Sequence, residues 1–98
     1  MPYIRREQRS AVDDILDNLV QEVLYKEPAL KLRKGFLNYI VTRIVLKTMR
    51  PDMGWSYTSI SDAISVLRDA ATEMERRLMA KREDYAIKEN GDMPEYIQ

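Results

Sequence analysis

Apolar residues recur every three or four positions in three segments of the chain, which is the spacing of an amphipathic helix. No segment shows the alternation that is typical of a half-buried strand. The first segment predicts a helix over about residues 10–26, with apolar positions Val12, Ile15, Leu16, Leu19, Val20, Val23 and Leu24. Ser10 is a suitable N-cap, and the carboxylates of Asp13 and Asp14 suit the positive end of the helix dipole.

The second and third segments are separated by a proline and a turn. The second predicts a helix over about 34–50, because Pro51 cannot continue it, while Gly35 leaves its start open. The third predicts a helix over 58–82 or beyond, started by a capping box of Ser59 and Asp62. Asn90-Gly91 would be a good C-cap for a longer version, which leaves residues 91–98 as a tail.

These elements predict an all-α fold, a helical hairpin plus a long third helix, in one domain over residues 1–98. A helix of ~25 residues is ~37 Å long, whereas helices of ~16 residues are ~24 Å long. Two short helices cannot cover its whole apolar stripe, so the surface around Met74, Leu78 and Met79 needs another partner. We expect a homo-oligomeric helical bundle, and the alternative is a tail that folds back over this surface.

Composition removes several classes of chemistry. The 98 residues contain no cysteine and no histidine, so disulfides, thiolate catalysis and histidine-ligated metals are excluded. Lysine plus arginine equals aspartate plus glutamate, so no net charge favours nucleic acid. No apolar run is long enough to span a membrane, and no signal peptide is apparent. We expect a soluble cytoplasmic protein with no cofactor and no metal.

Charge is nevertheless uneven along the chain. Residues 31–50 contain six basic side chains and no acidic one, whereas residues 11–24 contain four acidic side chains and no basic one. One interpretation is that an acidic helix packs beside a basic helix, each surface pair adding about 0–1 kcal/mol. The other is that the basic helix faces an anionic ligand or an acidic partner.

A polar stripe interrupts the apolar second helix. Asn38 and Thr42 are four residues apart, as are Tyr39 and Arg43, so each pair shares a helical face. With Tyr57 nearby, these side chains could bind a small anion, since arginine offers a planar fork and tyrosine a stacking surface. The alternative is a polar contact that fixes the register of an oligomer, as a buried asparagine does in coiled coils.

Acidic residues raise the possibility of a magnesium-dependent nucleotide pyrophosphatase. Asp13, Asp14 and Asp17, and also Asp69 and Glu73, stand at helical spacing. All-helical enzymes of this kind carry Glu-x-x-Glu followed by Glu-x-x-Asp, and this chain has no Glu-x-x-Glu that could begin such a pair. Solvated helix faces are the better explanation, and the sequence does not favour an enzyme.

Several short strings together resemble a family of small proteins from bacteria and tailed phages that begin Met-Pro-Tyr-Ile and have no established activity. They are Met1-Pro2-Tyr3-Ile4, the stretch from Leu37 to Arg43, Ser56-Tyr57, Arg76-Arg77 and Glu89-Asn90-Gly91-Asp92. The resemblance implies a phage or prophage origin and supplies no catalytic residues. Two departures are Lys81-Arg82, where members have Pro-Tyr and end the last helix, and Asp62 in place of Glu.

The leading hypothesis is a non-enzymatic oligomeric protein of phage or prophage type that binds or regulates through protein contacts, with a host protein as a possible partner. The alternative is a binder that sequesters a small anion, such as a nucleotide signal, in pockets between subunits. Its candidate residues are Asn38, Tyr39, Thr42, Arg43 and Tyr57. A metal-dependent nucleotide-processing enzyme comes third.

Overall fold

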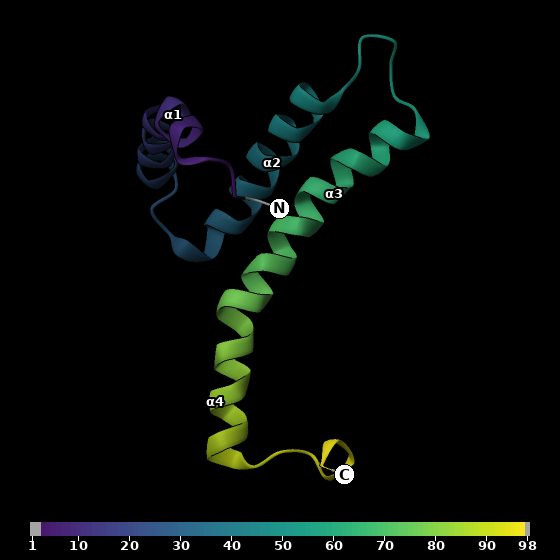
Figure 1. Cartoon of the computed structure of the whole chain (residues 1–98). Helices are drawn as coiled ribbons and strands as arrows, with labels where there is room; N and C mark the ends of the chain where they lie inside the picture. The colour runs from purple at the N-terminus through teal and green to yellow at the C-terminus, as the bar shows by residue number, and fades with distance from the viewer. Residues whose placement is uncertain (1–2, 98) are drawn as a thin grey trace. The chain divides into compact units, whose positions relative to one another are not determined.

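The structure is a computed structural model that describes residues 3–97. Its helices are α1 (Arg6–Lys26), α2 (Leu30–Met49), α3 (Tyr57–Met74) and α4 (Ala80–Asn90), with a π-helical turn, η1 (Glu75–Met79), between the last two. A short 3₁₀ turn, Pro94–Tyr96, lies in the tail. No strand occurs in the described residues. The predicted all-α fold with a long third helix is confirmed, since the helical ribbon continues from α3 into α4 (Figure 1).

The chain divides into two compact units. One is Tyr3–Ser65, which contains α1, α2 and the first turns of α3, and the other begins at Val66 and contains the rest of the long helix and the tail. The division falls inside α3, so one continuous helix contributes to both units. The prediction of a single domain over residues 1–98 therefore stays a prediction, because a shared helix is compatible with one domain or two.

Helix α1 begins at Arg6, four residues before the predicted start at Ser10. The backbone N–H of Arg5 donates to Gln8 Oε1 at 3.2 Å, which is the half of a capping box that an N3 glutamine supplies. Ser10 is not the cap, since its hydroxyl donates back to the Glu7 carbonyl at 3.2 Å inside the helix. The predicted end is confirmed at Lys26, before Glu27 and Pro28.

Helix α2 also begins earlier than predicted, at Leu30 rather than near residue 34. Arg33 explains the difference, because its Nε–H donates to the Glu27 carbonyl at 3.0 Å and its Nη2 donates to the Pro28 carbonyl at 2.8 Å. These bonds tie the first turn of α2 to the connection from α1. Gly35 therefore lies inside the helix, and α2 ends at Met49, one residue before the predicted end at Arg50.

The connection from α2 to α3 is a turn followed by a serine cap. Gly54 N–H donates to the Pro51 carbonyl at 3.0 Å, and Gly54 has a φ of 90°, which suits glycine. Ser56 and Ser59 form the cap: Ser56 N–H donates to Ser59 Oγ at 2.8 Å, and Ser59 N–H donates to Ser56 Oγ at 3.2 Å. The capping box is thus one turn earlier than the predicted pair of Ser59 and Asp62, because a second serine serves at the N3 position.

The long helix ends at the later of the two predicted ends, at Asn90-Gly91. Asn90 is its last residue, and Gly91 has a φ of 87°, with its N–H donating to the Ile87 carbonyl at 2.7 Å. The helix continues through Lys81-Arg82, which lies inside α4. The tail beyond it has the 3₁₀ turn in place of a fully extended chain.

Burial is sparse in the described residues. In the Tyr3–Ser65 unit the buried side chains are Val23 of α1, Val45 of α2 and Ala63 of α3, at 6%, 9% and 6% exposure. In the second unit no residue from Val66 to Ile97 is buried. The hairpin and the start of α3 therefore hold the small core of the chain.

Candidate functional site

The candidate residues of the polar stripe all lie in the Tyr3–Ser65 unit and are all exposed. Asn38, Tyr39, Thr42 and Arg43 lie on α2, and Tyr57 is the first residue of α3. Tyr39 is 61% exposed and Tyr57 is 90% exposed. In the isolated chain the stripe is thus a solvent-facing surface, and its role as a ligand site or an interface stays a prediction.

The structure brings Tyr39 and Arg43 together. Arg43 Nη1 donates to the Tyr39 hydroxyl at 3.2 Å, and the Arg43 guanidinium carbon lies 5.7 Å from the centre of the Tyr39 ring. The i, i+4 spacing on α2 makes this contact possible. The pair holds the guanidinium against the helix surface, where it still has donors free to face an anion or an acidic side chain.

The other three candidate residues make no side-chain hydrogen bond with the described part of the chain. Asn38 and Thr42 are one helical turn apart on α2, next to the Tyr39–Arg43 pair. Tyr57 follows the Ser56 cap and points its ring into solvent, as its exposure shows. All five candidate residues are exposed, so they form a surface and not an enclosed site.

An apolar groove lies between α1 and α2, on the side of α2 away from the polar stripe. Its cavity volume is about 310 Å³, and its accessible lining is apolar throughout. Two helices line it: Leu16, Leu19, Val20, Val23 and Leu24 come from α1, and Arg33, Leu37, Ile40, Val41 and Ile44 come from α2. Only Val23 among these residues is buried, so the groove is an open apolar surface of the hairpin.

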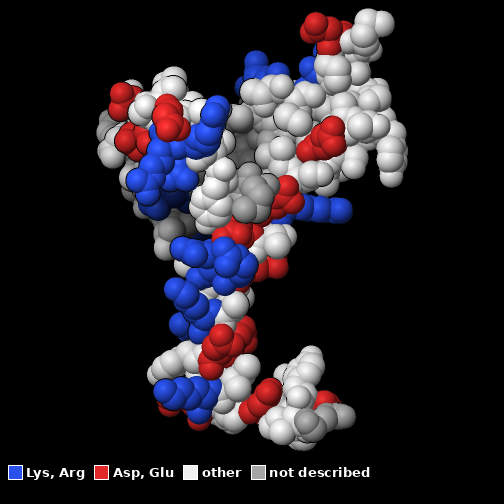
Figure 2. Space-filling model, in the orientation of Figure 1, with Lys and Arg blue, Asp and Glu red and all other residues white. Residues whose placement is uncertain are grey.

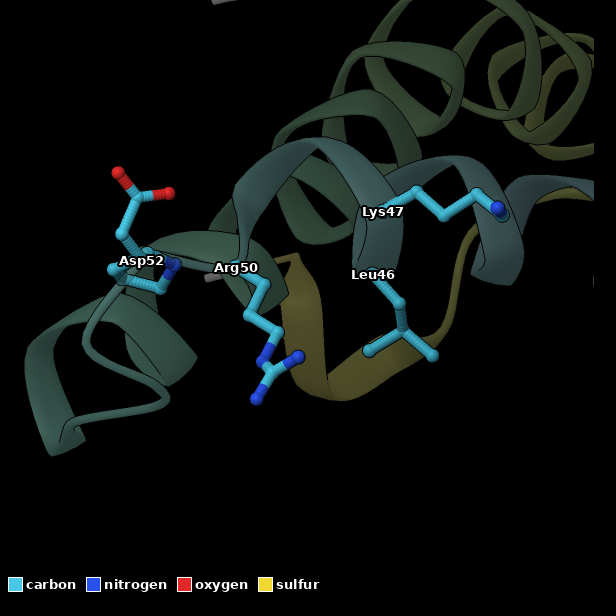
Figure 3. A pocket seen from close by; sticks show the side chains of 5 residues that line it. Leu46, Lys47, Arg50 and Asp52 are labelled. Carbon is cyan, nitrogen blue, oxygen red and sulfur yellow. The ribbon is translucent and has the colours of Figure 1, made fainter.

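A second hollow, of about 470 Å³, lies at the end of α2 and is lined by Leu46, Lys47, Arg50, Pro51 and Asp52. Two cations here would suit an anion if they converged. Figure 3 shows that the side chains of Lys47 and Arg50 point in different directions and that Asp52 points away from both. This hollow therefore lacks the convergent donors of a built anion site.

The charged side chains keep the distribution that the sequence indicates. In the described residues, none of the four acidic side chains of α1 between residues 11 and 24 forms an ion pair. Lysine and arginine side chains gather on the long helix around η1 and the start of α4 (Figure 2): Arg76, Arg77, Lys81 and Arg82. Of these, Arg76 is paired with Glu73 of its own helix at 2.6 Å.

Residues 3–97 contain neither a metal-binding cluster of side chains nor a membrane-spanning helix. No group of three or more histidine, cysteine, aspartate or glutamate side chains is placed to hold a metal ion within that range. No helix in the same range combines the length and the apolar composition that crossing a bilayer requires. The groove and the polar stripe are thus the two surface features that a functional account has to explain.

Comparison with known families identifies the chain. Residues 1–93 match a family described as a domain of unknown function, DUF6899. The chain belongs to this family. The match includes both units and stops within the tail, so it covers the hairpin, the groove and the long helix of this DUF6899 protein. No match was found among the curated proteins or among the solved structures.

The Met-Pro-Tyr-Ile start on which the sequence resemblance partly rests begins with Met1 and Pro2, which lie outside the described residues. Tyr3 and Ile4 are described and are 52% and 44% exposed. The groove was not predicted from the sequence, although its signal was present in the apolar spacing of both hairpin helices. The sequence predicts an uncovered apolar surface on the third helix, because that helix is longer than the two that could cover it.

Proposed function

We propose that this protein is a non-enzymatic, homo-oligomeric helical protein that binds or regulates through protein contacts. The observation that carries the proposal is the imbalance of burial in the described residues. Thirty large apolar side chains there are at least 36% exposed, whereas the buried core consists of Val23, Val45 and Ala63. Soluble monomers rarely leave large contiguous apolar patches in water, and such patches usually mark interfaces.

The arrangement of the exposed residues supports protein contact over small-molecule chemistry. Apolar side chains line the groove of the hairpin, and further ones lie along the long helix at Met74, Leu78 and Met79. Obligate interfaces resemble a protein core cut in half, and they are more apolar than other surfaces. The chain also contains no histidine or cysteine, the residues most often used as general bases and nucleophiles alongside serine.

The setting we propose is phage or prophage biology. The resemblance of the sequence to small bacterial and tailed-phage proteins supports this setting. A protein of this kind would act on a host protein through an apolar or charged surface that remains open after the copies have assembled. The basic helix α2, with no acidic residue from 31 to 50, offers such a surface to an acidic partner.

One observation favours a second function, the sequestering of a small anion between subunits. Arg43 is already held by Tyr39 on the exposed, basic side of α2, and Asn38 and Thr42 lie beside the pair. A neighbouring subunit that covered this stripe would turn an open surface into a pocket. Under this alternative, Arg43→Ala abolishes anion binding while the oligomer survives.

The test is native mass spectrometry of the protein purified from cells, followed by denaturation and small-molecule analysis. The expected result is an oligomer that carries no small molecule at a fixed ratio. A nucleotide or other anion retained at a fixed ratio to subunits, and lost in Arg43→Ala, would replace the protein-contact function with the sequestering function. A chain that stays monomeric at about 100 µM would contradict both.

A further inference from the structure

The apolar groove of the hairpin has the dimensions of a helix-binding site. Its lining runs from Leu16 to Leu24 on α1 and from Arg33 to Ile44 on α2, which is about 12 Å and 16 Å of helix. A helical segment of two to three turns therefore fits along it. Grooves of this kind bind amphipathic helices through apolar side chains spaced three or four residues apart.

The 74–82 segment of the long helix has the complementary shape. Met74, Leu78 and Met79 are 63%, 70% and 54% exposed. The π-helical turn contains one extra residue, as the bond from the Ala80 N–H to the Glu75 carbonyl shows. Viewed along the helix axis, Met74 therefore lies at an angle between those of Leu78 and Met79. The three side chains therefore gather on one side of a segment about 13 Å long.

Charges at the edges of these two surfaces are also complementary. Asp13 and Asp17 precede the groove residues Leu16 and Val20 by three positions each, so they lie along one edge of the groove. On the long helix, Arg77 lies between Met74 and Leu78, and Arg82 follows Met79 by three positions. Within the described residues, none of these four side chains has an ion-pair partner. Each pair is separated by roughly 6–8 Å along its helix, so the two spacings match.

From this match we infer that the apolar groove between α1 and α2 receives the 74–82 segment of a second copy of the chain, with Asp13 and Asp17 facing Arg77 and Arg82. The inference rests on the proposed function and names the surfaces through which the copies assemble. Each chain has one groove and one such segment, and the smallest assembly that leaves no groove open is a dimer in which two chains exchange their segments.

The exposed apolar area at the two surfaces is large enough for a stable dimer if the contact covers it. The groove side chains that remain open to water are about half exposed, and the three side chains of the segment are more than half exposed. Together they offer on the order of 700 Å² of apolar surface for each contact, and two symmetric contacts reach the ~1,200–2,000 Å² of a specific interface.

Disulfide trapping tests the inference directly, because the chain has no cysteine and each introduced thiol is unique. Val20→Cys lies in the groove and Leu78→Cys lies in the segment. The two variants are expressed separately, one with a mass-shifting tag, mixed and oxidised mildly. The matched control replaces Val20→Cys by Tyr25→Cys, which is 82% exposed on the opposite side of α1.

The expected result is a mixed disulfide of Val20→Cys with Leu78→Cys that forms at least tenfold faster than that of Tyr25→Cys with Leu78→Cys. Equal trapping of both pairs in a protein that is oligomeric by light scattering would overturn the groove contact and leave the proposed self-assembly standing. A monomer would overturn both. A chain carrying both Val20→Cys and Leu78→Cys that closes on itself as a monomer would show that its own helix fills the groove.

Charge reversal provides an independent readout that needs no thiol. The double variant Asp13→Lys/Asp17→Lys should weaken the dimer about 10-fold to 30-fold, and Arg77→Glu/Arg82→Glu in the partner should restore it to within about threefold. Asp14→Lys, on the side of α1 away from the groove, is the control and should leave the dimer unchanged. Failure of the rescue, with all variants equally helical by circular dichroism, would contradict the proposed pairing.

Discussion

The two sides of helix α2 differ in a way that explains most of what the chain offers to a partner. One side lines the apolar groove with Leu37, Val41 and Ile44, which are 40–48% exposed. The other side carries the polar stripe, where Arg43 is held by Tyr39. A single helix thus presents an apolar surface, whose exposure to water is unfavourable, and a polar surface that water solvates. In our proposal the groove drives assembly, and the stripe contributes to selectivity.

A charge placed in the groove should have the largest effect. Val41→Asp introduces a carboxylate where we propose that a second copy packs, and burial of an unpaired charge is costly. We expect its dimer dissociation constant to rise by about 100-fold, measured by sedimentation equilibrium.

Thr42→Asp is the matched control, since it adds the same charge one residue along, in the polar stripe. It should leave the dissociation constant within about threefold of the unmodified chain. An equal rise of the dimer dissociation constant in both variants would contradict the proposed difference between the two sides of α2. It would place the polar stripe in the interface as well.

Two arginines of α2 that make different contacts should differ in their effect on stability. Arg33→Ala removes the bonds to the Glu27 and Pro28 carbonyls, and we expect a loss of about 1–2 kcal/mol in the free energy of unfolding. Arg43→Ala removes one exposed contact to Tyr39 and should change it by less than about 0.5 kcal/mol. Urea denaturation measures both, and a larger loss for Arg43→Ala would mean that the stripe is structural.

The smallest effect concerns two glycines. Gly35 lies inside α2 on the side away from the groove, and an added Cβ would meet nothing within 4 Å. Gly35→Ala should therefore raise the free energy of unfolding by about 0.5–1 kcal/mol and leave the dimer unchanged.

Gly91→Ala should act in the opposite direction, because Gly91 has a φ of 87° at the end of α4. Thermal unfolding followed by circular dichroism measures both glycine variants. Destabilisation by Gly35→Ala would indicate that this side of α2 is covered in the assembled protein.

The parts of the fold that local chemistry sets could be predicted from the sequence. Pro51 ends α2, and Asn90-Gly91 ends the long helix, because each residue acts through its own backbone. The starts of α1 and α2 were placed too late. Gln8 and Arg33 determine those starts by reaching three to six residues back along the chain, and neither is among the usual N-cap residues.

Only part of the candidate site could be predicted from the sequence. Helical spacing was enough to place Tyr39 and Arg43 in contact, and the structure confirms that contact. The groove depends on the angle and distance at which the apolar faces of α1 and α2 meet. Periodicity along a single helix does not contain that information.

The central claim is that the groove is filled by a second copy, and the mass of the assembled protein tests it most directly. Native mass spectrometry of the unmodified chain and of Val41→Asp should give twice 11.5 kDa for the first and a single chain for the second. A monomeric mass for the unmodified chain would contradict the account. An oligomeric mass for Val41→Asp equal to that of Thr42→Asp would also contradict it.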